Sequence, residues 1–233
     1  MGRRRILLKL SGEALMGQKG FGVDPDYLTS IAATLKGIQQ KGIQIGVVIG
    51  GGNIFRGIQR DTFGMERAPA DHIGMLATVI NGIALQQALR QQGAPCRVMS
   101  ALGETDIVEP FIWDVALRYL DSGAIVLFVG GTGNPFFTTD TSAALRAAQI
   151  NADLLLKATN VDGVYDRDPK GDPSARRYDR LTYHEALQME LRVMDAAAIS
   201  ICRDNGIPIK VFAVSSLERG IMEETFGTMI TSG

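Results

Sequence analysis

The chain has 233 residues, of which 45% are hydrophobic, and its formal net charge at pH 7 is -1. This length and apolar content are enough for one α/β domain or two small lobes with a sizeable core. The near-neutral charge gives no general basic field for nucleic acid or an anionic membrane, so we expect neither partner, and any polyanion must be bound by a local cluster of charges.

The first residues are not expected to form a targeting segment. Lys9 interrupts the apolar run that begins at Ile6, so no signal-peptide core follows the basic start. No segment has the length and apolar character needed to span a bilayer. Cys96 and Cys202 lie far apart and form no Cys-x-x-Cys pair, which is typical of small core residues in a reducing compartment. We therefore expect a cytoplasmic protein.

Short apolar runs predict buried strands, in chain order, at residues 6–10, 43–49, 97–99, 124–129, 153–157 and 209–214. Amphipathic stretches between them predict helices at residues 25–41, 71–92, 111–122, 140–150 and 194–205. Asp24 before Pro25 is a favourable helix start, and Gly93 and Gly123 are favourable helix stops. The polar stretch at 166–180 is expected to be a surface loop. Alternating strands and helices predict an open, mostly parallel α/β sheet sandwiched between helices.

Ligands of open α/β sheets bind beyond the carboxyl ends of the strands. Unusual sequences follow several strands here: "KLSGE" (9–13), "GGGNIFRG" (50–57), "GGTGNPFFTTD" (130–140) and "KATNVDGVYDRDP" (157–169). Glycine-rich backbone and lysine side chains are the donors that a polyphosphate needs, with space for Mg²⁺. The common phosphate motifs are absent, because Gln18 replaces the Walker A lysine and no G-x-G-x-x-G sequence occurs.

The consecutive glycines Gly50 to Gly52 raise a separate question. Glycine in a strand or loop costs conformational entropy, so the triplet indicates that something approaches the main chain closely. With Arg56 nearby, a bound anion is the favoured explanation. A tight strand-to-helix turn is the alternative.

Charged residues at the strand ends are candidates for phosphoryl chemistry. Lys9 ends the first predicted strand beside Gly12, where it can neutralise phosphoryl oxygens. Lys157 ends a buried strand and must face a cavity or a partner. Asp140 opens a predicted helix, and helix capping alone would also explain an acid at that position.

These strand-end motifs, together with "DHIGMLAT" (71–78), have the order and spacing of the bacterial uridylate kinases, the UMP kinases of the amino-acid kinase superfamily, which this sequence resembles over nearly its whole length. The resemblance implies one amino-acid kinase-like domain, with acceptor binding in residues 1–150 and ATP binding in residues 151–233. It also implies transfer of the ATP γ-phosphoryl group to UMP, giving UDP and ADP, in pyrimidine nucleotide biosynthesis. Mg²⁺ would be bound mainly through the ATP phosphates.

The resemblance implies that Lys9, Lys157 and Asp140 are catalytic, with Asp140 orienting the two lysines. The residues that it implies for ATP are Lys9, Leu10, Ser11, Gly12, Gly52, Arg56, Thr159, Tyr165 and Asp168. Those that it implies for UMP are Gly51, Asp71, Thr132, Gly133, Asn134, Pro135, Phe136, Phe137, Thr138 and Thr139. From the residues alone, Asp71 is also explained as a helix cap and Tyr165 as a half-buried packing aromatic.

Regulation and assembly are also implied by the family. The segment "GQKGFG" resembles the stretch that binds GTP as an activator in some bacterial UMP kinases, and a simple connector is the alternative. Its residues are Gly17, Gln18, Lys19, Gly20, Phe21 and Gly22. The family further implies inhibition by UTP and a homohexamer. The apolar sequence at 73–89 has few charges for a solvated helix face, although internal packing explains it almost as well. Arg3 to Arg5 are interpreted as a solvated N-terminal face.

Other functions fit parts of this pattern. A regulator that senses UMP or UTP without turnover needs the glycines but not the lysines. A carbamate or acylamino-acid kinase of the same superfamily is a further alternative, but the acylamino-acid kinases carry Gly-Met-x-x-Lys where this sequence has Met194 and Asp195. Assays of phosphoryl transfer to nucleotide and amino-acid acceptors separate these functions.

Overall fold

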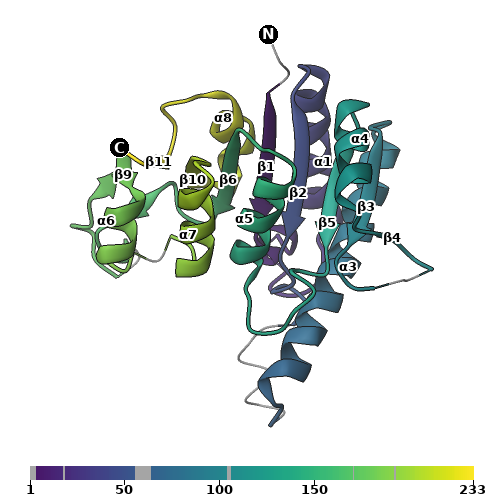
Figure 1. The fold of residues 1–233 in the computed structure, drawn as a ribbon, viewed down its shortest axis with the longest axis horizontal. Helices are drawn as coiled ribbons and strands as arrows, with labels where there is room; N and C mark the ends of the chain where they lie inside the picture. Colours follow the sequence, from purple (N-terminus) through teal and green to yellow (C-terminus); the bar gives the residue numbers. More distant parts are fainter. Residues whose placement is uncertain (1–3, 18, 56–63, 104–105, 170, 192) are drawn as a thin grey trace.

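The structure is a computed structural model that describes residues 4–17, 19–55, 64–103, 106–169, 171–191 and 193–233. A nine-stranded sheet with the order β4-β3-β5-β2-β1-β6-β10-β11-β9 runs through the molecule (Figure 1). Its strands are β1 (Arg5–Leu10), β2 (Gln44–Ile49), β3 (Cys96–Ser100), β4 (Glu109–Pro110), β5 (Ile125–Val129), β6 (Leu154–Thr159), β9 (Arg180–Thr182), β10 (Ile209–Ala213) and β11 (Thr228–Thr231). Neighbouring strands are parallel except β10 and β11.

Helices cover both faces of the sheet (Figure 1). One face carries α1 (Pro25–Gln40), α3 (Arg67–Gln91) and α8 (Leu217–Met222). The other carries α4 (Trp113–Asp121), α5 (Thr139–Gln149), α6 (Tyr183–Gln188) and α7 (Ala196–Asp204). Short 3-10 turns occur at Gly12–Leu15 and Val214–Ser216, and β7 (Val164–Tyr165) pairs with β8 (Arg177–Tyr178) as a separate antiparallel hairpin. The predicted α/β fold class is confirmed.

Alternation along the central strands decides which way the lysines point. Leu7 of β1 and Leu155 of β6 belong to the core beneath α4, α5, α6 and α7. Because side chains alternate along a strand, Lys9 and Lys157 point to the same face as these leucines. The two lysines are also partners in the parallel register of β1 and β6. The alternate β1 positions Ile6, Leu8 and Leu10 face the core with α1.

The predicted strands and helices are all present, with shifted ends. The largest shift is in α3, which begins at Arg67 rather than at 71. The Asp24 side chain caps α1, accepting hydrogen bonds from the Asp26 and Tyr27 N–H groups at 3.0 and 3.3 Å. Gly93 and Gly123 follow helix ends with φ of 74° and 86°, the conformation that favours glycine at a helix stop.

The elements that the sequence did not predict are short: β4, the β7–β8 hairpin, β9, β11, α6 and α8. Two to six residues are too few for a readable hydrophobic period. The stretch at 166–180 is therefore not a simple loop, because its later part forms β8 and starts β9.

Several smaller expectations can be compared with the structure. Cys96 and Cys202 are free and buried, as predicted for small core residues. Within the described ranges no helix combines the length and apolar character needed to cross a membrane. The solvated interpretation is wrong for Arg5, whose guanidinium bonds to Gln44 Oε1 at 2.7 Å and to Asp121 Oδ1 at 2.9 Å. Arg3 lies outside the described residues.

Candidate active site

A buried charge cluster lies near the carboxyl ends of β1 and β6. Lys9 and Lys157 come from these strands, and Asp140 comes from the first turn of α5. Lys9 Nζ lies 3.0 Å from Asp140 Oδ1, and Lys157 Nζ lies 2.8 Å from Asp140 Oδ2. The three side chains are only 10%, 14% and 14% exposed. One carboxylate therefore holds two lysines, one on each oxygen.

The cluster carries an excess of positive charge. Burial by itself raises the pKa of Asp140, but the charges of Lys9 and Lys157 outweigh burial and lower this pKa. Burial lowers the pKa of Lys157, and Lys9 adds to this effect against the opposing charge of Asp140. Two ammonium groups and one carboxylate leave one positive charge to attract an anion.

The start of α5 is capped by Thr138 and not by Asp140. Thr138 Oγ1 accepts a hydrogen bond from the Asp140 N–H at 3.0 Å. The same hydroxyl donates to the carboxylate of Asp195, which also accepts from Thr141 Oγ1 at 2.8 Å. Asp195 itself caps α7 through the Ala198 N–H at 2.8 Å. The capping explanation of Asp140 is therefore wrong, and its carboxylate is left for the lysines.

The glycine triplet after β2 serves more than one purpose. A Cβ atom on Gly50 would lie 2.9 Å from Gly12 N, and one on Gly51 would lie 2.7 Å from Gly74 O of α3. Close packing of the protein on itself therefore explains these two glycines. A Cβ atom on Gly52 would meet no described atom within 4 Å. Close packing among the described residues therefore accounts for Gly50 and Gly51 but not for Gly52.

The loop after β2 is held by a buried pair of asparagines. Asn81 Nδ2 donates to Asn53 Oδ1 at 2.7 Å, and Asn53 Nδ2 donates to Asn81 Oδ1 at 3.0 Å. Asn81 Nδ2 also donates to Gly50 O at 2.7 Å, and Asn53 Nδ2 to Gly22 O at 2.8 Å. No local pattern predicts this pair, because its members come from a loop and from the middle of α3.

The turn after β1 contains an unpaired hydroxyl. Ser11 Oγ is buried and has no hydrogen-bond partner among the described residues. Buried hydroxyl groups normally have one, but Ser11 lines none of four cavities among the described residues, so a ligand would reach this hydroxyl only after the turn rearranges. The side chain of the preceding Leu10 is fully buried in the core with α1, which leaves only its backbone to reach a ligand.

A cleft of about 310 Å³ opens between α3 and the loop that follows β5. The residues predicted for UMP that line it are Gly51, Asp71, Thr132, Asn134, Phe137, Thr138 and Thr139. Gly52, which was predicted for ATP, lines this cleft and not the cavity beside Lys157. Gly133, Pro135 and Phe136 belong to the same loop but do not line the cleft. The lining residues that were not predicted are Phe55, Arg67, Ala70, Gly74, Met75, Thr78 and Gly131. Helical spacing from Asp71 would have found those on α3, which recur every three or four residues.

Asp71 ties this loop to α3. The helix begins after Glu66, so the capping explanation of Asp71 is wrong. Asp71 Oδ2 accepts hydrogen bonds from the Phe136 N–H at 2.7 Å and from Arg67 Nε at 2.8 Å. Phe136 has φ of 73°, which a residue with a side chain rarely adopts. The carboxylate of Asp71 thus stabilises a strained loop at the edge of the cleft.

A second cavity, of about 690 Å³, lies beside Lys157 and the β7–β8 hairpin. Of the residues predicted for ATP, Thr159, Tyr165 and Asp168 line it. The Tyr165 hydroxyl donates to Asp162 Oδ1 at 2.7 Å, and this bond raises the tyrosine pKa. The lining residues that were not predicted are Asn160, Val161, Gly163, Val164, Asp166, Arg167, Pro169, Met189, Glu190, Leu191, Val193 and Val211.

Other predicted residues are not placed at these cavities. Arg56 and Gln18 lie outside the described residues. The described part of the segment at 17–22 lines neither cavity. It contacts the loop after β2, because the Gly22 N–H donates to Asn53 O at 2.8 Å.

Comparison with known proteins gives a consistent result. The amino acid kinase family matches residues 4–213. A UMP kinase structure from Bacillus anthracis is 39% identical with a TM-score of 0.94, over 100% of this chain and 97% of that chain. A UMP kinase from Ureaplasma parvum is 35% identical with a TM-score of 0.93, over 99% and 100% of the two chains. A uridylate kinase from Archaeoglobus fulgidus is 28% identical with a TM-score of 0.74, over 97% and 99%.

The chain therefore belongs to the amino acid kinase family. The resemblance to the bacterial UMP kinases, which the strand-end motifs predicted, is confirmed.

Proposed function

We propose that this protein is a UMP kinase that transfers the γ-phosphoryl group of ATP to UMP and forms UDP and ADP. The observation that carries the proposal is the cluster of Lys9, Asp140 and Lys157 beside two cavities. Lys157 lines the larger cavity, and Thr139, the neighbour of Asp140, lines the smaller cleft. The solved relatives, which are UMP kinases, support the choice of acceptor. The buried free cysteines favour the cytoplasm, where pyrimidine nucleotide biosynthesis would use the reaction.

In this proposal ATP occupies the cavity beside Lys157, and UMP occupies the cleft beside Asp71, so residues 1–150 bind the acceptor and residues 151–233 the donor. A phosphate oxygen of UMP attacks the γ-phosphorus of ATP while the bond to the bridging oxygen breaks, and ADP leaves. Lys9 and Lys157 stabilise the charge on the transferred oxygens, and Asp140 orients both lysines. The remaining phosphate contacts are assigned to Ser11, Gly12, Gly52 and Arg56.

ATP would bring Mg²⁺, bound mainly through its phosphates. Among the described residues no group of three or more His, Cys, Asp and Glu side chains is placed to hold a metal ion. Asp140 is the carboxylate within the cluster, and both of its oxygens already contact lysines. A site with few protein carboxylates fits Mg²⁺, because this ion is commonly held by one or two carboxylates together with the substrate phosphates. The bound ion would neutralise part of the phosphate charge.

An ADP-release assay with UMP, CMP, AMP, carbamate and acylamino-acid acceptors tests the activity. We expect turnover to be fastest with UMP. Tight binding of UMP without ADP release would instead support a uridine-nucleotide-sensing regulator. Turnover with carbamate or an acylamino acid, and none with UMP, would support another kinase of the superfamily.

Asp71→Asn should raise the KM for UMP by about tenfold or more and leave the KM for ATP close to normal, because a hydrogen bond to a charged group contributes about 1.5 to 3 kcal/mol. Glu66→Gln is the matched control. It removes one negative charge near the same helix start, but Glu66 is exposed and does not line the cleft. Separate titrations of UMP and ATP make the comparison. An unchanged KM for UMP would assign Asp71 to loop packing alone.

We also propose that a second copy of the chain covers the exposed apolar side of α3 within a homohexamer. Leu76, Ile80 and Ile83 are 56%, 53% and 37% exposed, and their spacing puts them on one side of the helix. Apolar patches of this kind favour an interface. Ile80→Lys should give smaller species in light scattering, whereas Met222→Lys on α8 should not. An unchanged mass for Ile80→Lys would contradict the assignment.

Regulation is proposed through GTP as an activator at residues 17–22 and through UTP as an inhibitor. The hydrogen bonds between Gly22 and Asn53 connect this segment to the loop after β2, which supports coupling to the active site. In Lys19→Ala the effect of GTP on the UMP dependence should vanish while the rate without GTP survives. Lys41→Ala, which changes an exposed lysine on the surface, should keep the GTP effect. Equal wild-type rates with and without GTP would leave the segment as a connector.

A further inference from the structure

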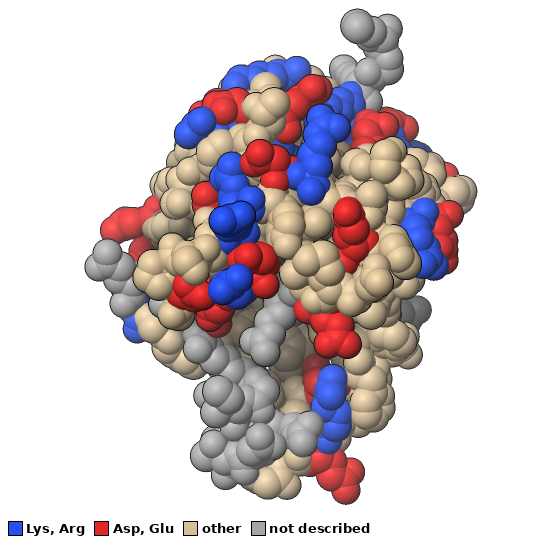
Figure 2. All heavy atoms as spheres, turned by 90° about the vertical axis from the view of Figure 1, so that its left-hand side faces the viewer, with Lys and Arg blue, Asp and Glu red and all other residues tan. Residues whose placement is uncertain are grey.

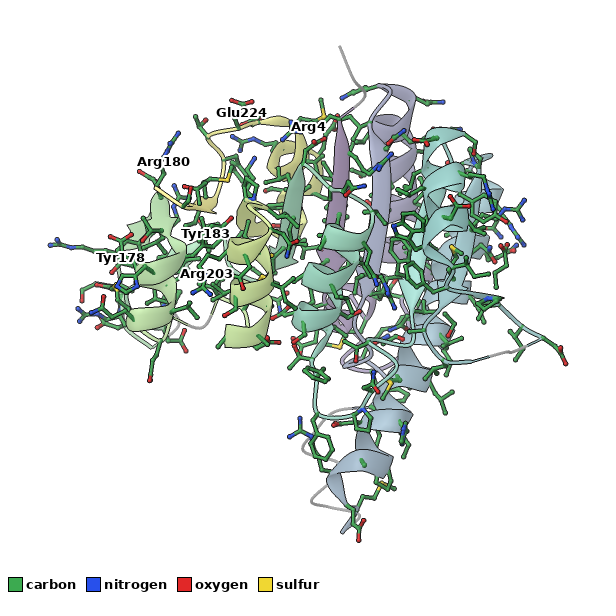
Figure 3. All side chains as sticks on the ribbon, in the orientation of Figure 1. Arg4, Tyr178, Arg180, Tyr183, Arg203 and Glu224 are labelled. Atoms are coloured by element: carbon green, nitrogen blue, oxygen red, sulfur yellow. The ribbon has the colours of Figure 1, made fainter. Side chains whose placement is uncertain are left out.

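A third cavity, of about 520 Å³, lies at the edge of the sheet opposite the active site. Its lining comes from the residue before β1, the starts of β6, β9 and β10, the segment between α8 and β11, and β11 itself. Arg4 is five residues before Lys9, a separation of roughly 16 Å along an extended strand. Figure 3 shows Arg4, Arg180 and Glu224 together at this edge, at the top of the view. No lining residue is shared with either proposed nucleotide cavity.

Cationic side chains reach this cavity from three elements. Lys210 of β10 is 1% exposed, and its ammonium group donates one hydrogen bond to the carbonyl oxygen of Glu223. A lysine has three N–H donors, so this single described acceptor leaves two of them for a ligand. Arg4 and Arg180 also line the cavity, and neither forms an ion pair with any described residue. Burial and the nearby charge of Arg4 lower the pKa of Lys210, against the opposing charges of Glu224 and Glu223.

The lining also carries three acids, Asp153, Asp179 and Glu224, so its formal charges balance. Asp153 Oδ2 accepts a hydrogen bond from the Arg5 N–H at 2.7 Å. Asp179 Oδ1 lies 3.3 Å from the guanidinium of Arg177. Neither contact cancels the charge of these aspartates, because the Arg5 N–H is neutral and Arg177 also pairs with Asp162 at 3.0 Å. The unused N–H donors of Lys210, and not a net charge of the lining, are what favours an oxyanion at this cavity.

A ligand of this cavity has to be recognised by the groups that line it and not by a long-range electrostatic field. Figure 2 shows the adjoining face of the molecule with Lys and Arg side chains interspersed with Asp and Glu side chains over its upper part. Mixed charges of this kind produce no broad field that would hold a large polyanion. The cavity therefore fits a small ligand better than a nucleic acid or an anionic membrane.

We propose that this cavity binds a small organic anion through its phosphate or carboxylate group. Lys210, Arg4 and Arg180 hold the oxyanion, since lysine supplies a point charge and arginine a fork of donors for either group. The volume lies within the range of small-molecule sites. The apolar lining available to the rest of the ligand consists of Leu154, Pro208 and Met229. The proposal stands independently of the UMP kinase activity.

A fluorescent label at the cavity tests the proposal without interference from the active site. Thr225 is exposed and lines the cavity, whereas Cys96 and Cys202 are buried, so Thr225→Cys directs an environment-sensitive fluorophore to one position. Pyrophosphate and citrate are then titrated as probes for phosphate and carboxylate ligands. We expect a saturable change in emission with at least one probe, and the tighter probe identifies the ligand class. The lack of a saturable change with both probes would overturn the proposal.

Variants of the labelled protein identify the binding groups. Arg4→Gln and Arg180→Gln should each move the titration midpoint to about tenfold higher concentration, as expected for loss of a charged hydrogen bond. Arg203→Gln is the control, because Arg203 lies on α7, pairs with Asp204 and does not line the cavity (Figure 3). Unchanged midpoints in both cavity variants would overturn the proposal even if the probes bind. These two variants keep the test valid if buried Lys210 does not tolerate replacement.

Discussion

Replacing Lys9 with methionine should lower turnover by about 10²- to 10³-fold while the protein stays folded. The Lys9 ammonium lies 3.0 Å from Asp140 and beside the position proposed for the transferred phosphoryl group. Removal of one preorganised donor to developing charge costs about 3 to 4 kcal/mol in the transition state. Methionine is apolar and flexible, so it can fill the space of a side chain that is only 10% exposed. The measurement is kcat at saturating UMP and ATP, with circular dichroism as the check on folding.

Lys41→Met is the matched control for this prediction. Lys41 is exposed and pairs with Glu218 at 2.9 Å, so the same substitution there should leave kcat unchanged. Lys9→Arg should not restore the activity, because a planar guanidinium cannot replace a compact ammonium in a buried site. Near-normal turnover in folded Lys9→Met would remove Lys9 from the catalytic set.

Lys9 and Lys157 show which features of the site local sequence patterns can predict and which they cannot. Each lysine follows apolar strand residues, so its position near a strand end could be predicted, and Lys157 does line a cavity. Their contact with one carboxylate could not, because it depends on β1 lying next to β6 in matched register. The strand order β4-β3-β5-β2-β1-β6-β10-β11-β9 results from crossover connections, and no local pattern encodes it.

The aspartates at the site show why small errors in helix ends matter. Asp71 and Asp140 both lie near predicted helix starts, where capping and ligand binding are indistinguishable from sequence alone. The observed starts, Arg67 for α3 and Thr139 for α5, remove both residues from the cap position. In this protein a shift of one to four residues therefore decides which role each carboxylate can have.

The second cavity was only partly predictable for a different reason. Its walls include the β7–β8 hairpin and the turn between α6 and α7, which are built from very short elements. Val193, for example, contributes its backbone carbonyl as an acceptor for Lys157 Nζ. A backbone contact of this kind depends on how the turn folds, so it cannot be predicted from the residue types.

Asp140→Asn should reduce both turnover and stability. Asparagine keeps the size of the side chain but removes the carboxylate that pairs with both buried lysines, Lys9 and Lys157. Removing one member of a buried ion pair costs about 3 to 5 kcal/mol of folding free energy. Asp114→Asn is the control, because the exposed pair of Asp114 with Arg118 at 2.7 Å should contribute only about 0.3 to 0.5 kcal/mol. Urea unfolding at pH 7 measures both free energies.

The pH dependence and a double variant show whether the loss in Asp140→Asn arises from charge. The folded-state pKa of Asp140 lies below its ordinary value of 3.8, so its ionised form stabilises the protein above pH 3.8, and this contribution is lost as the pH falls through the lowered value. The stability difference between wild type and Asp140→Asn should therefore narrow in acid. Adding Lys157→Met removes one of the two repelling charges and should recover part of the stability at pH 7, but not the turnover. A double variant as unstable as Asp140→Asn, with a difference that does not change with pH, would show that Asp140 acts by packing and not through the lysines.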